Sequence, residues 1–258
     1  MDIIASGSNK IVKYVRSLSV AGKKGREAHA AFVVEGEKFV GEIRHPWEIE
    51  FVLTSKSYAD INGPSGGYVC HIAADHIFNS LSDAVHAQGI LAVVRQRTFG
   101  LEEVVTGANP LVLLLEEIND PGNLGSMLRI AHGLGCSGIV LLGNCADVYS
   151  PKVIRSSAGS IFHIPFAKAS FKQIKNSLTA KGIRVFASTA KADKALYNAD
   201  FTGPLAFLIG NEARGISADA LAAADEHVKI PVYSESLNAS VACGILAYEV
   251  LRQRTIIG

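Results

Sequence analysis

Leu111-Val-Leu-Leu-Leu-Glu-Glu-Ile-Asn-Asp-Pro-Gly-Asn-Leu-Gly-Ser-Met-Leu-Arg129 is the most informative stretch of this 258-residue chain. Its apolar start predicts a β-strand, and the strand gives way to a segment rich in Gly, Asn and Ser. Asp120 followed by Pro121 predicts a helix start, because Asp is a favoured N-cap and Pro fits the first helical position. A strand that leads through a polar loop into a helix is typical of the sheet edge where α/β proteins build their sites.

Two later segments repeat this arrangement. Ile209-Gly-Asn-Glu-Ala-Arg-Gly215 follows an apolar run at 205–209, and Ile230-Pro-Val-Tyr-Ser-Glu-Ser-Leu-Asn-Ala-Ser240 follows a short strand predicted at 228–230. Further apolar runs at 138–142 and 182–187 alternate with helical stretches. Continuous Leu, Ile and Val runs between helices indicate parallel strands that are buried on both faces. The sequence therefore predicts an α/β domain with a mostly parallel sheet.

A literal G-x-G-x-x-G occurs at Gly133-Leu-Gly-Cys-Ser-Gly138. A dinucleotide fingerprint needs a strand before its glycines and a helix after them. Here the predicted order is the reverse, with a helix ending near Leu134 and a strand starting at Gly138. We therefore interpret these glycines as a helix end and a turn into the sheet.

The first hundred residues differ in composition from the rest. Short strand-like runs at 32–34, 50–53 and 89–94 mix with helical pieces, which predicts a small α/β module. The turn-rich segment Thr106-Gly-Ala-Asn-Pro110 precedes the most apolar strand, so we expect domains at 1–105 and 106–258. Six basic residues against one acid within residues 1–26 predict phosphate contacts, although a solvated helix face explains them equally well; they are Lys10, Lys13, Arg16, Lys23, Lys24 and Arg26.

Charge and cysteine content limit the partners and cofactors that the sequence predicts. The formal net charge of +1 gives no overall positive field that would indicate nucleic-acid binding. The four cysteines show no CxxC spacing, so we expect no metal. The start of the chain lacks a basic segment followed by an apolar one, as a signal peptide would have. The longest uncharged stretch, 130–146, has 17 residues including four glycines, which makes a poor membrane span. We expect a cytoplasmic protein with no membrane partner.

Taken together, the three polar segments resemble the signature motifs of the SpoU (TrmH-type) ribose 2′-O-methyltransferases of the SPOUT superfamily. The matching stretches are 120–129, 209–216 and 230–242, in the family's order and spacing. A looser similarity links Asn9-Lys-Ile-Val-Lys13, Arg26 and Phe32-Val-Val-Glu-Gly-Glu-Lys38 to the family's substrate-binding domain, which is related to the ribosomal protein L30e fold.

The resemblance implies a fold, a reaction and a set of site residues. The fold would be an L30e-like α/β domain followed by a SPOUT domain with a C-terminal deep trefoil knot, in a homodimer joined through the C-terminal domain. The reaction would move a methyl group from S-adenosylmethionine to a ribose 2′-hydroxyl of RNA. The family's cofactor positions fall on Thr189, Gly210, Asn211, Ile230 and Leu237, and its reaction centre falls on Asn123, Arg129, Glu212, Ser236 and Asn238.

Some of these residues can also be explained by ordinary structural roles. Ser236 would serve as an ordinary N-cap of the last helix, predicted over 237–254, and Arg129 would serve as a surface arginine paired with an acid. Arg129 is proposed as the base in this family, yet an arginine stays protonated at almost any pH. We therefore expect Arg129 to fix an RNA phosphate or to polarise the hydroxyl, near Asn123 on the same helix and with Glu212 as a neighbour. Glu235 departs from the family pattern and would affect which RNA is accepted.

The leading interpretation is an RNA ribose 2′-O-methyltransferase that acts on large-subunit (23S) rRNA, because separate N-terminal domains of this type are commoner among rRNA enzymes of the family. Three alternatives stay open at this point: a tRNA 2′-O-methyltransferase, a catalytically silent RNA-binding or ribosome-assembly factor on the same fold, and a small-molecule enzyme. The small residues of the last helix leave two further possibilities, close packing within the chain or a subunit contact.

Overall fold

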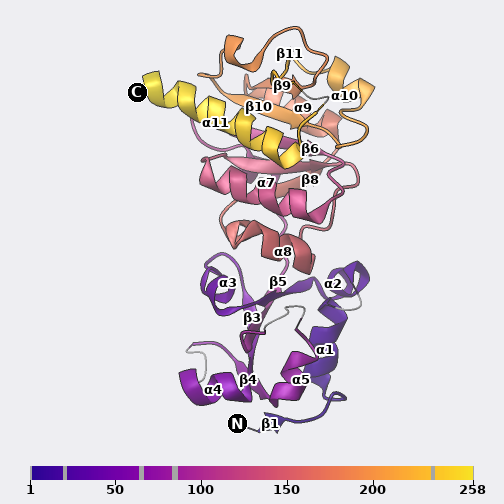
Figure 1. The fold of residues 1–258 in the computed structure, drawn as a ribbon, viewed down its shortest axis with the longest axis vertical. Coiled ribbons are helices and arrows are strands. Elements are labelled where there is room, and N and C mark those ends of the chain that lie inside the picture. The colour runs from indigo at the N-terminus through magenta and orange to yellow at the C-terminus, as the bar shows by residue number, and fades with distance from the viewer. Residues whose placement is uncertain (1, 20–21, 64–66, 83–86, 234–235, 258) are drawn as a thin grey trace. The chain divides into compact units, whose positions relative to one another are not determined.

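The computed structural model describes residues 2–19, 22–63, 67–82, 87–233 and 236–257 (Figure 1). The chain forms two compact units. The first comprises residues 1–97 together with 147–162, and the second comprises residues 98–146 together with 163–258.

The first unit is built on a mixed five-stranded sheet of order β1-β4-β3-β5-β2. Strands β1, β4 and β3 run parallel, whereas β5 is antiparallel to both β3 and β2. The strands are β1 Ile3–Ile4, β2 Ala31–Glu35, β3 Ile49–Ser55, β4 Cys70–Ala73 and β5 Ile90–Arg95. The helices from the N-terminal part are α1 Lys10–Ser19, α2 Lys23–His29, α3 Glu37–Gly41, α4 Lys56–Asn62 and α5 Asp75–Asn79.

Helix α1 shows why this unit folds. Val12, Val15 and Leu18 recur at helical spacing, and all three are fully buried in a core that includes Leu53 and Leu91 of the sheet. The opposite face of α1 carries polar and basic side chains. Burial of one apolar stripe thus fixes the helix on the sheet and leaves its charged face to solvent.

Residues 147–162 belong to the first unit although they lie between two strands of the second. They contain α8 Pro151–Ser157 and the 3-10 turn η1 Ser160–Phe162. The indole of Trp47 donates to the carbonyl of Phe162 at 3.2 Å, and the Tyr149 hydroxyl donates to the Arg97 carbonyl at 2.6 Å. This interleaving could not be predicted from the sequence, because the partners of the segment lie more than fifty residues away in the chain.

The second unit is a six-stranded sheet of order β11-β9-β10-β6-β7-β8 in which each neighbouring pair is parallel. The strands are β6 Leu111–Glu116, β7 Gly138–Leu142, β8 Phe166–Ala169, β9 Arg184–Ser188, β10 Leu205–Ile209 and β11 Glu226–Val228. The helices are α6 Leu101–Val104, α7 Pro121–Gly133, α9 Phe171–Ala180, α10 Ala218–Ala222 and α11 Ala239–Ile257, with a 3-10 turn η2 at Leu196–Asn198. The predicted parallel α/β sheet is confirmed.

Both faces of this sheet are covered. Val112 and Leu114 of β6 lie in a core with Ile174 and Leu178 of α9. Helices α7 and α11 pack against each other and also contact the sheet, as Figure 1 shows for α11 in yellow beside α7. Cover on both faces explains why residues 111–115 are buried without alternation.

The polar ends of α7 follow the sequence prediction. Asp120 is the N-cap, and its carboxylate accepts from the Asn123 N–H at 2.8 Å. At the other end, Gly135 adopts a left-handed φ of 68° between α7 and β7. The glycine pattern at 133–138 is therefore a helix-to-strand turn, as expected. Within the described part of the chain, no helix is long and apolar enough to span a bilayer.

Candidate active site

The three polar segments lie in the second unit, and two of them start at the same sheet edge. Strand β10 pairs with β6 so that Ile209 lies opposite Leu115. The segments that begin after these residues therefore leave the sheet side by side. The third segment follows β11, which pairs with β9 through Val228 and Ser188. This sheet edge is the one at which open α/β sheets bind ligands.

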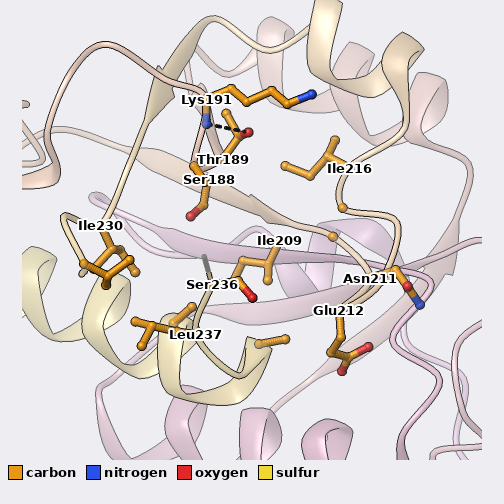
Figure 2. Close-up of a pocket in the computed structure, with 16 residues that line it drawn as sticks. Ser188, Thr189, Lys191, Ile209, Asn211, Glu212, Ile216, Ile230, Ser236 and Leu237 are labelled. Atoms are coloured by element: carbon orange, nitrogen blue, oxygen red, sulfur yellow. Dashed lines mark hydrogen bonds between the residues drawn. The ribbon is translucent and has the colours of Figure 1, made fainter. Parts of the chain in front are cut away.

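A cavity of about 270 Å³ opens between these loops (Figure 2). Five of its lining residues were predicted to hold the cofactor and two to serve the reaction centre. Its walls are mainly aliphatic, from Ile209, Ile216 and Val232 as well as from the predicted residues. The predicted residues that line it are Thr189, Gly210, Asn211, Glu212, Ile230, Ser236 and Leu237.

Gly210 shows how closely the loops approach each other. A Cβ built on Gly210 would lie 2.3 Å from the carbonyl carbon of Gly215, so no side chain fits there. The close approach brings the backbone on both sides of the turn to the cavity wall. An apolar slot with bare backbone and a few polar groups suits a flat heteroaromatic ligand with hydrogen-bonding substituents, such as the adenosine of S-adenosylmethionine.

Three side chains from the three segments form one hydrogen-bond chain. Glu212 Oε1 accepts from Asn123 Nδ2 at 2.6 Å, and Asn123 Oδ1 accepts from Asn238 Nδ2 at 3.0 Å. Glu212 also lines the cavity, so the chain runs from the cavity wall to the starts of α7 and α11. The structure thus brings together three of the five residues predicted for the reaction centre.

Asn238, and not Ser236, caps the last helix. The Asn238 Oδ1 accepts from the Ser240 N–H at 2.9 Å and from the Val241 N–H at 3.3 Å. Helix α11 begins at Ala239, two residues later than predicted. The N-cap interpretation of Ser236 was wrong, because the helix starts further along the chain. Since the cap occupies Oδ1, the amide Nδ2 of Asn238 faces Asn123.

The Asn211 side chain is engaged inside its own loop. Its Nδ2 donates to the Glu117 carbonyl at 2.9 Å, while its Oδ1 accepts from the N–H groups of Ala213 and Arg214 at 2.9 and 3.0 Å. Figure 2 shows this side chain directed away from the cavity. Asn211 therefore shapes the cavity through its main chain, and its amide supports the loop.

Arg129 lies apart from this hydrogen-bond chain. It is exposed on α7 and does not line the cavity. Among the described residues, no hydrogen bond or ion pair joins Arg129 to Asn123 or to Glu212, whose carboxylate instead binds Asn123. Six residues advance an α-helix by about 240° beyond a full turn, so Asn123 and Arg129 point in different directions. Glu212 therefore binds Asn123 in this structure, and its expected place beside Arg129 stays a prediction.

Of the six basic residues near the N-terminus, five are at least partly exposed and one, Arg26, is buried. Lys10, Lys13 and Lys24 are exposed, Lys23 lies 3.7 Å from Glu27, and Arg16 donates to the Ser80 hydroxyl at 3.3 Å.

Arg26 is different because it is only 5% exposed. Its Nε and Nη2 donate to Asp147 Oδ2 at 2.9 and 2.7 Å, and its Nη1 donates to the Leu18 carbonyl. Arg26 is a structural residue, so we remove it from the predicted RNA-binding set. Glu235 lies outside the described residues.

The sheet, the cavity and the loop geometry define an α/β enzyme with a ligand site at the carboxyl edge of a parallel sheet. The SpoU rRNA Methylase family model matches residues 110–248, and a model of the MRM3-like substrate binding domain matches residues 9–92. The chain belongs to the SpoU rRNA methylase family. The predicted family is confirmed.

Two curated relatives illustrate the similarity. The chain is 30% identical over 253 residues to the 23S rRNA (guanosine(2553)-2′-O)-methyltransferase RlmP of Bacillus subtilis, covering 97% of this chain and 99% of that protein. It is 34% identical over 173 residues to the 23S rRNA (uridine(2479)-2′-O)-methyltransferase of Streptomyces viridochromogenes, covering 64% of this chain and 60% of that protein.

Solved structures agree with this placement. The AdoMet-bound rRNA methyltransferase from Sinorhizobium meliloti superposes with a TM-score of 0.87 at 26% identity, over 97% of each chain. The SpoU methyltransferase AviRb from Streptomyces viridochromogenes, in complex with AdoMet, gives a TM-score of 0.85 at 27% identity, over 96% of this chain and 98% of that one. The chain is a methyltransferase, and S-adenosylmethionine is its cofactor.

Proposed function

We propose that this enzyme transfers the methyl group of S-adenosylmethionine to a ribose 2′-hydroxyl of large-subunit rRNA. The observation that carries the proposal is the Glu212–Asn123–Asn238 chain, which joins all three motifs at the cavity wall. The names of the full-length relative from Bacillus subtilis and of the second relative support 23S rRNA as the substrate class.

The residues present fit the cofactor. S-adenosylmethionine supplies an electrophilic methyl group on a cationic sulfonium. The backbone around Gly210, Ile230 and Leu237 would hold the adenosine, with the aliphatic walls excluding water. Among the described lining residues Glu212 is the one acid and Lys191 the one base, so the lining as a whole carries no net charge. The Glu212 carboxylate would attract a cationic group only locally, on its own side of the cavity.

The polar chain would position the nucleophile. Asn123 is held from both sides, by Glu212 and by Asn238, so its amide has a fixed orientation from which to align a ribose hydroxyl. Arg129 would hold an RNA phosphate as a guanidinium clamp. The hydroxyl proton would then pass to that phosphate or to water, because a guanidinium is a poor base.

The first unit would bind the RNA outside the target nucleotide. Exposed Lys10 and Lys13 on α1, with Lys23 and Lys24 on α2, present positive charge suited to phosphates. The division into a substrate-binding domain at 1–105 and a methyltransferase domain at 106–258 stays a proposal, to which the compact units add that residues 98–105 pack with the second unit and residues 147–162 with the first. The match of residues 9–92 to a substrate-binding domain supports this assignment.

The enzyme would work as a homodimer in the cytoplasm. Helix α11 exposes Val241, Ile245 and Tyr248, at 51, 38 and 58%, along a groove of about 470 Å³ that also includes Tyr197. Exposed apolar side chains in such a row favour burial by a second subunit. The trefoil knot stays a prediction.

Transfer of tritium from labelled S-adenosylmethionine to ribosomal RNA tests the proposed function. We expect incorporation into 23S rRNA at a ribose 2′-oxygen, and we expect Glu212→Gln to reduce it by a factor of about 10² or more. Cofactor binding without incorporation into any RNA would favour a silent assembly factor. Incorporation into tRNA alone would contradict rRNA as the substrate and identify the protein as a tRNA methyltransferase.

Mapping 2′-O-methyl groups in ribosomes from cells with and without the gene would then identify the nucleotide. A single site lost in the deletion strain, and regained on complementation with the wild-type gene but not with the Glu212→Gln variant, is the expected result. An unchanged methylation map would contradict an rRNA substrate.

A further inference from the structure

Glu117 has an unusual backbone conformation at the edge of the site. Its φ of 53° lies in the left-handed region, which a residue with a Cβ rarely adopts. In the described part of the chain only Ala30 and Ala158 share this property among non-glycine residues. Such a conformation persists only when the surroundings hold it in place.

Three contacts hold Glu117. Its N–H donates to the Leu142 carbonyl at 3.0 Å, and its carbonyl accepts from Asn211 Nδ2 at 2.9 Å. Its carboxylate pairs with the Arg214 guanidinium at 2.6 Å. A Cβ built on Gly143 would lie 3.1 Å from the Glu117 Cγ, so the Glu117 side chain passes directly over that glycine.

Two of these contacts reach the loop that carries the cavity residues. Asn211 and Arg214 both lie between Gly210 and Gly215, and Asn211 also pairs with Gly215 across the turn. The preceding acid, Glu116, anchors the end of the same loop, because it accepts from the Ser217 N–H at 2.8 Å and from the Ser217 hydroxyl at 2.6 Å. The end of β6 thus holds the loop at its start, middle and end.

Glu212 lies inside this anchored segment, between Asn211 and Arg214. Its carboxylate must meet Asn123, which stands on α7 just beyond the same end of β6. Any shift of the 211–215 turn would move both the cavity wall at Gly210 and the partner of Asn123. Glu117, which lies between β6 and α7 in the chain, therefore holds this loop through its carboxylate on Arg214 and its main-chain carbonyl on Asn211.

We propose that Glu117 is a positioning residue for methyl transfer, which holds the 210–217 loop through its ion pair with Arg214 and its carbonyl bond to Asn211. The inference rests on the proposed function. It explains why a glutamate occupies a position where glycine would fit the backbone better: glycine would keep the carbonyl bond but lose the carboxylate that reaches Arg214.

The test compares Glu117→Gln, Arg214→Met and Glu117→Gly with the wild-type enzyme. Calorimetry gives the affinity for S-adenosylhomocysteine, and kinetics gives kcat and KM separately. We expect each variant to bind S-adenosylhomocysteine about 2- to 5-fold more weakly, as is typical for loss of a solvent-accessible ion pair. Glu117→Gly should do so without lowering the thermal midpoint, since glycine adopts φ near 50° freely.

The charge-reversed pair Glu117→Arg with Arg214→Glu should regain most of the affinity. The matched control is Asp60→Asn, which removes an ion pair of the same 2.6 Å length in the first unit, between Lys56 and Asp60. The control should leave ligand affinity unchanged.

Wild-type affinity in both Glu117→Gln and Glu117→Gly would overturn the positioning role, as would an equal loss in the control. Failure of the wild-type enzyme to bind S-adenosylhomocysteine at all would instead contradict the proposed function, so the two failures are distinguishable.

Discussion

Asn238 serves two structures at once. Its carbonyl oxygen caps α11, and its amide nitrogen extends the hydrogen-bond chain to Asn123. The family resemblance predicted Asn238 in the reaction centre. Its role as the cap was not predicted, because the last helix was expected to begin at residue 237 and not at Ala239.

Asn238→Asp separates these two roles. Aspartate is as good an N-cap as asparagine, but it replaces the Nδ2 donor with an acceptor that faces Asn123 Oδ1. We expect stability to stay within about 0.5 kcal/mol of wild type while kcat falls at least about 10-fold. Urea unfolding and single-turnover methyl transfer measure the two effects.

Asn238→Ala provides the comparison, because it removes the cap as well and should cost about 1 kcal/mol of stability. If the aspartate variant turned over at the wild-type rate, the hydrogen-bond chain would have no role in the reaction.

Gly210→Ala tests the close approach of the cofactor loop. The new Cβ would overlap the Gly215 carbonyl carbon at 2.3 Å, so the loop must move. We expect the affinity for S-adenosylhomocysteine to fall at least about 10-fold, with a loss of about 1–3 kcal/mol in stability from overpacking. Calorimetry and urea unfolding provide the two measurements.

Gly203→Ala is the matched control, since a Cβ there meets no atom within 4 Å. Equal ligand affinity in the two variants would show that the loop tolerates displacement.

Among single residues, contacts between positions close in sequence could be predicted, whereas contacts between positions far apart in sequence could not. The Asp120 cap joins residues three apart, and capping rules predicted it. The bond between Asn123 and Glu212 joins residues 89 apart, so only the family resemblance placed both in one site. The side-chain role of Asn211 inside its loop had no sequence signal beyond the presence of a turn.

Among the elements, strands with continuous apolar runs were the most predictable. The structure has β7 at Gly138–Leu142 and β10 at Leu205–Ile209, as expected from residues buried on both faces. Segment 147–162 was the least predictable, because its apolar and aromatic residues pack on the first unit although the chain around it belongs to the second.

The Arg26–Asp147 pair anchors that segment to α2. Both side chains are largely shielded, with 5 and 16% exposed. Removal of one partner leaves an uncompensated charge, so we expect Arg26→Met to lower the free energy of unfolding by about 3–5 kcal/mol. Urea unfolding followed by circular dichroism measures the change.

The double variant Arg26→Met with Asp147→Leu should recover part of this loss, because no lone charge remains buried. A double variant no more stable than Arg26→Met alone would show that packing, not the unpaired charge, sets the cost. Neither substitution touches the cavity, so ligand affinity of the folded fraction should not change.

For the molecule as a whole, assembly is the first testable property. The exposed apolar row on α11 predicts that Val241→Glu with Tyr248→Glu yields monomers, since both side chains are more than half exposed and no core contact is lost. Light scattering should give twice the chain mass for wild type and the chain mass for the variant. A monomeric wild-type enzyme would contradict the proposed dimer.

The stability of the whole molecule at alkaline pH is the second testable property. Burial raises the pKa of Cys136 to about 12 and the pKa of Cys243 well above its usual value. Above pH 9 the unfolded chain loses these protons while the folded chain keeps them, so stability is unaffected below pH 9 and falls as pH rises above it. The slope is at most about 1.4 kcal/mol per pH unit for each thiol.

Urea unfolding at pH 8, 9 and 10 should show this fall in the wild-type protein. Cys243→Ala should make it shallower, because one buried thiol is removed. Identical slopes for the two proteins would exclude Cys243 as a source of the pH dependence.

The chain passes between its two units three times, after residues 97, 146 and 162. A substrate-binding module exchanged with a relative by a single cut near residue 105 would leave Asp147, Tyr149 and Phe162 facing foreign partners. Functional hybrids would require two grafts, one for the N-terminal part and one for residues 147–162. Target specificity in such hybrids should follow the pair of grafts, and a single graft should yield protein that folds poorly.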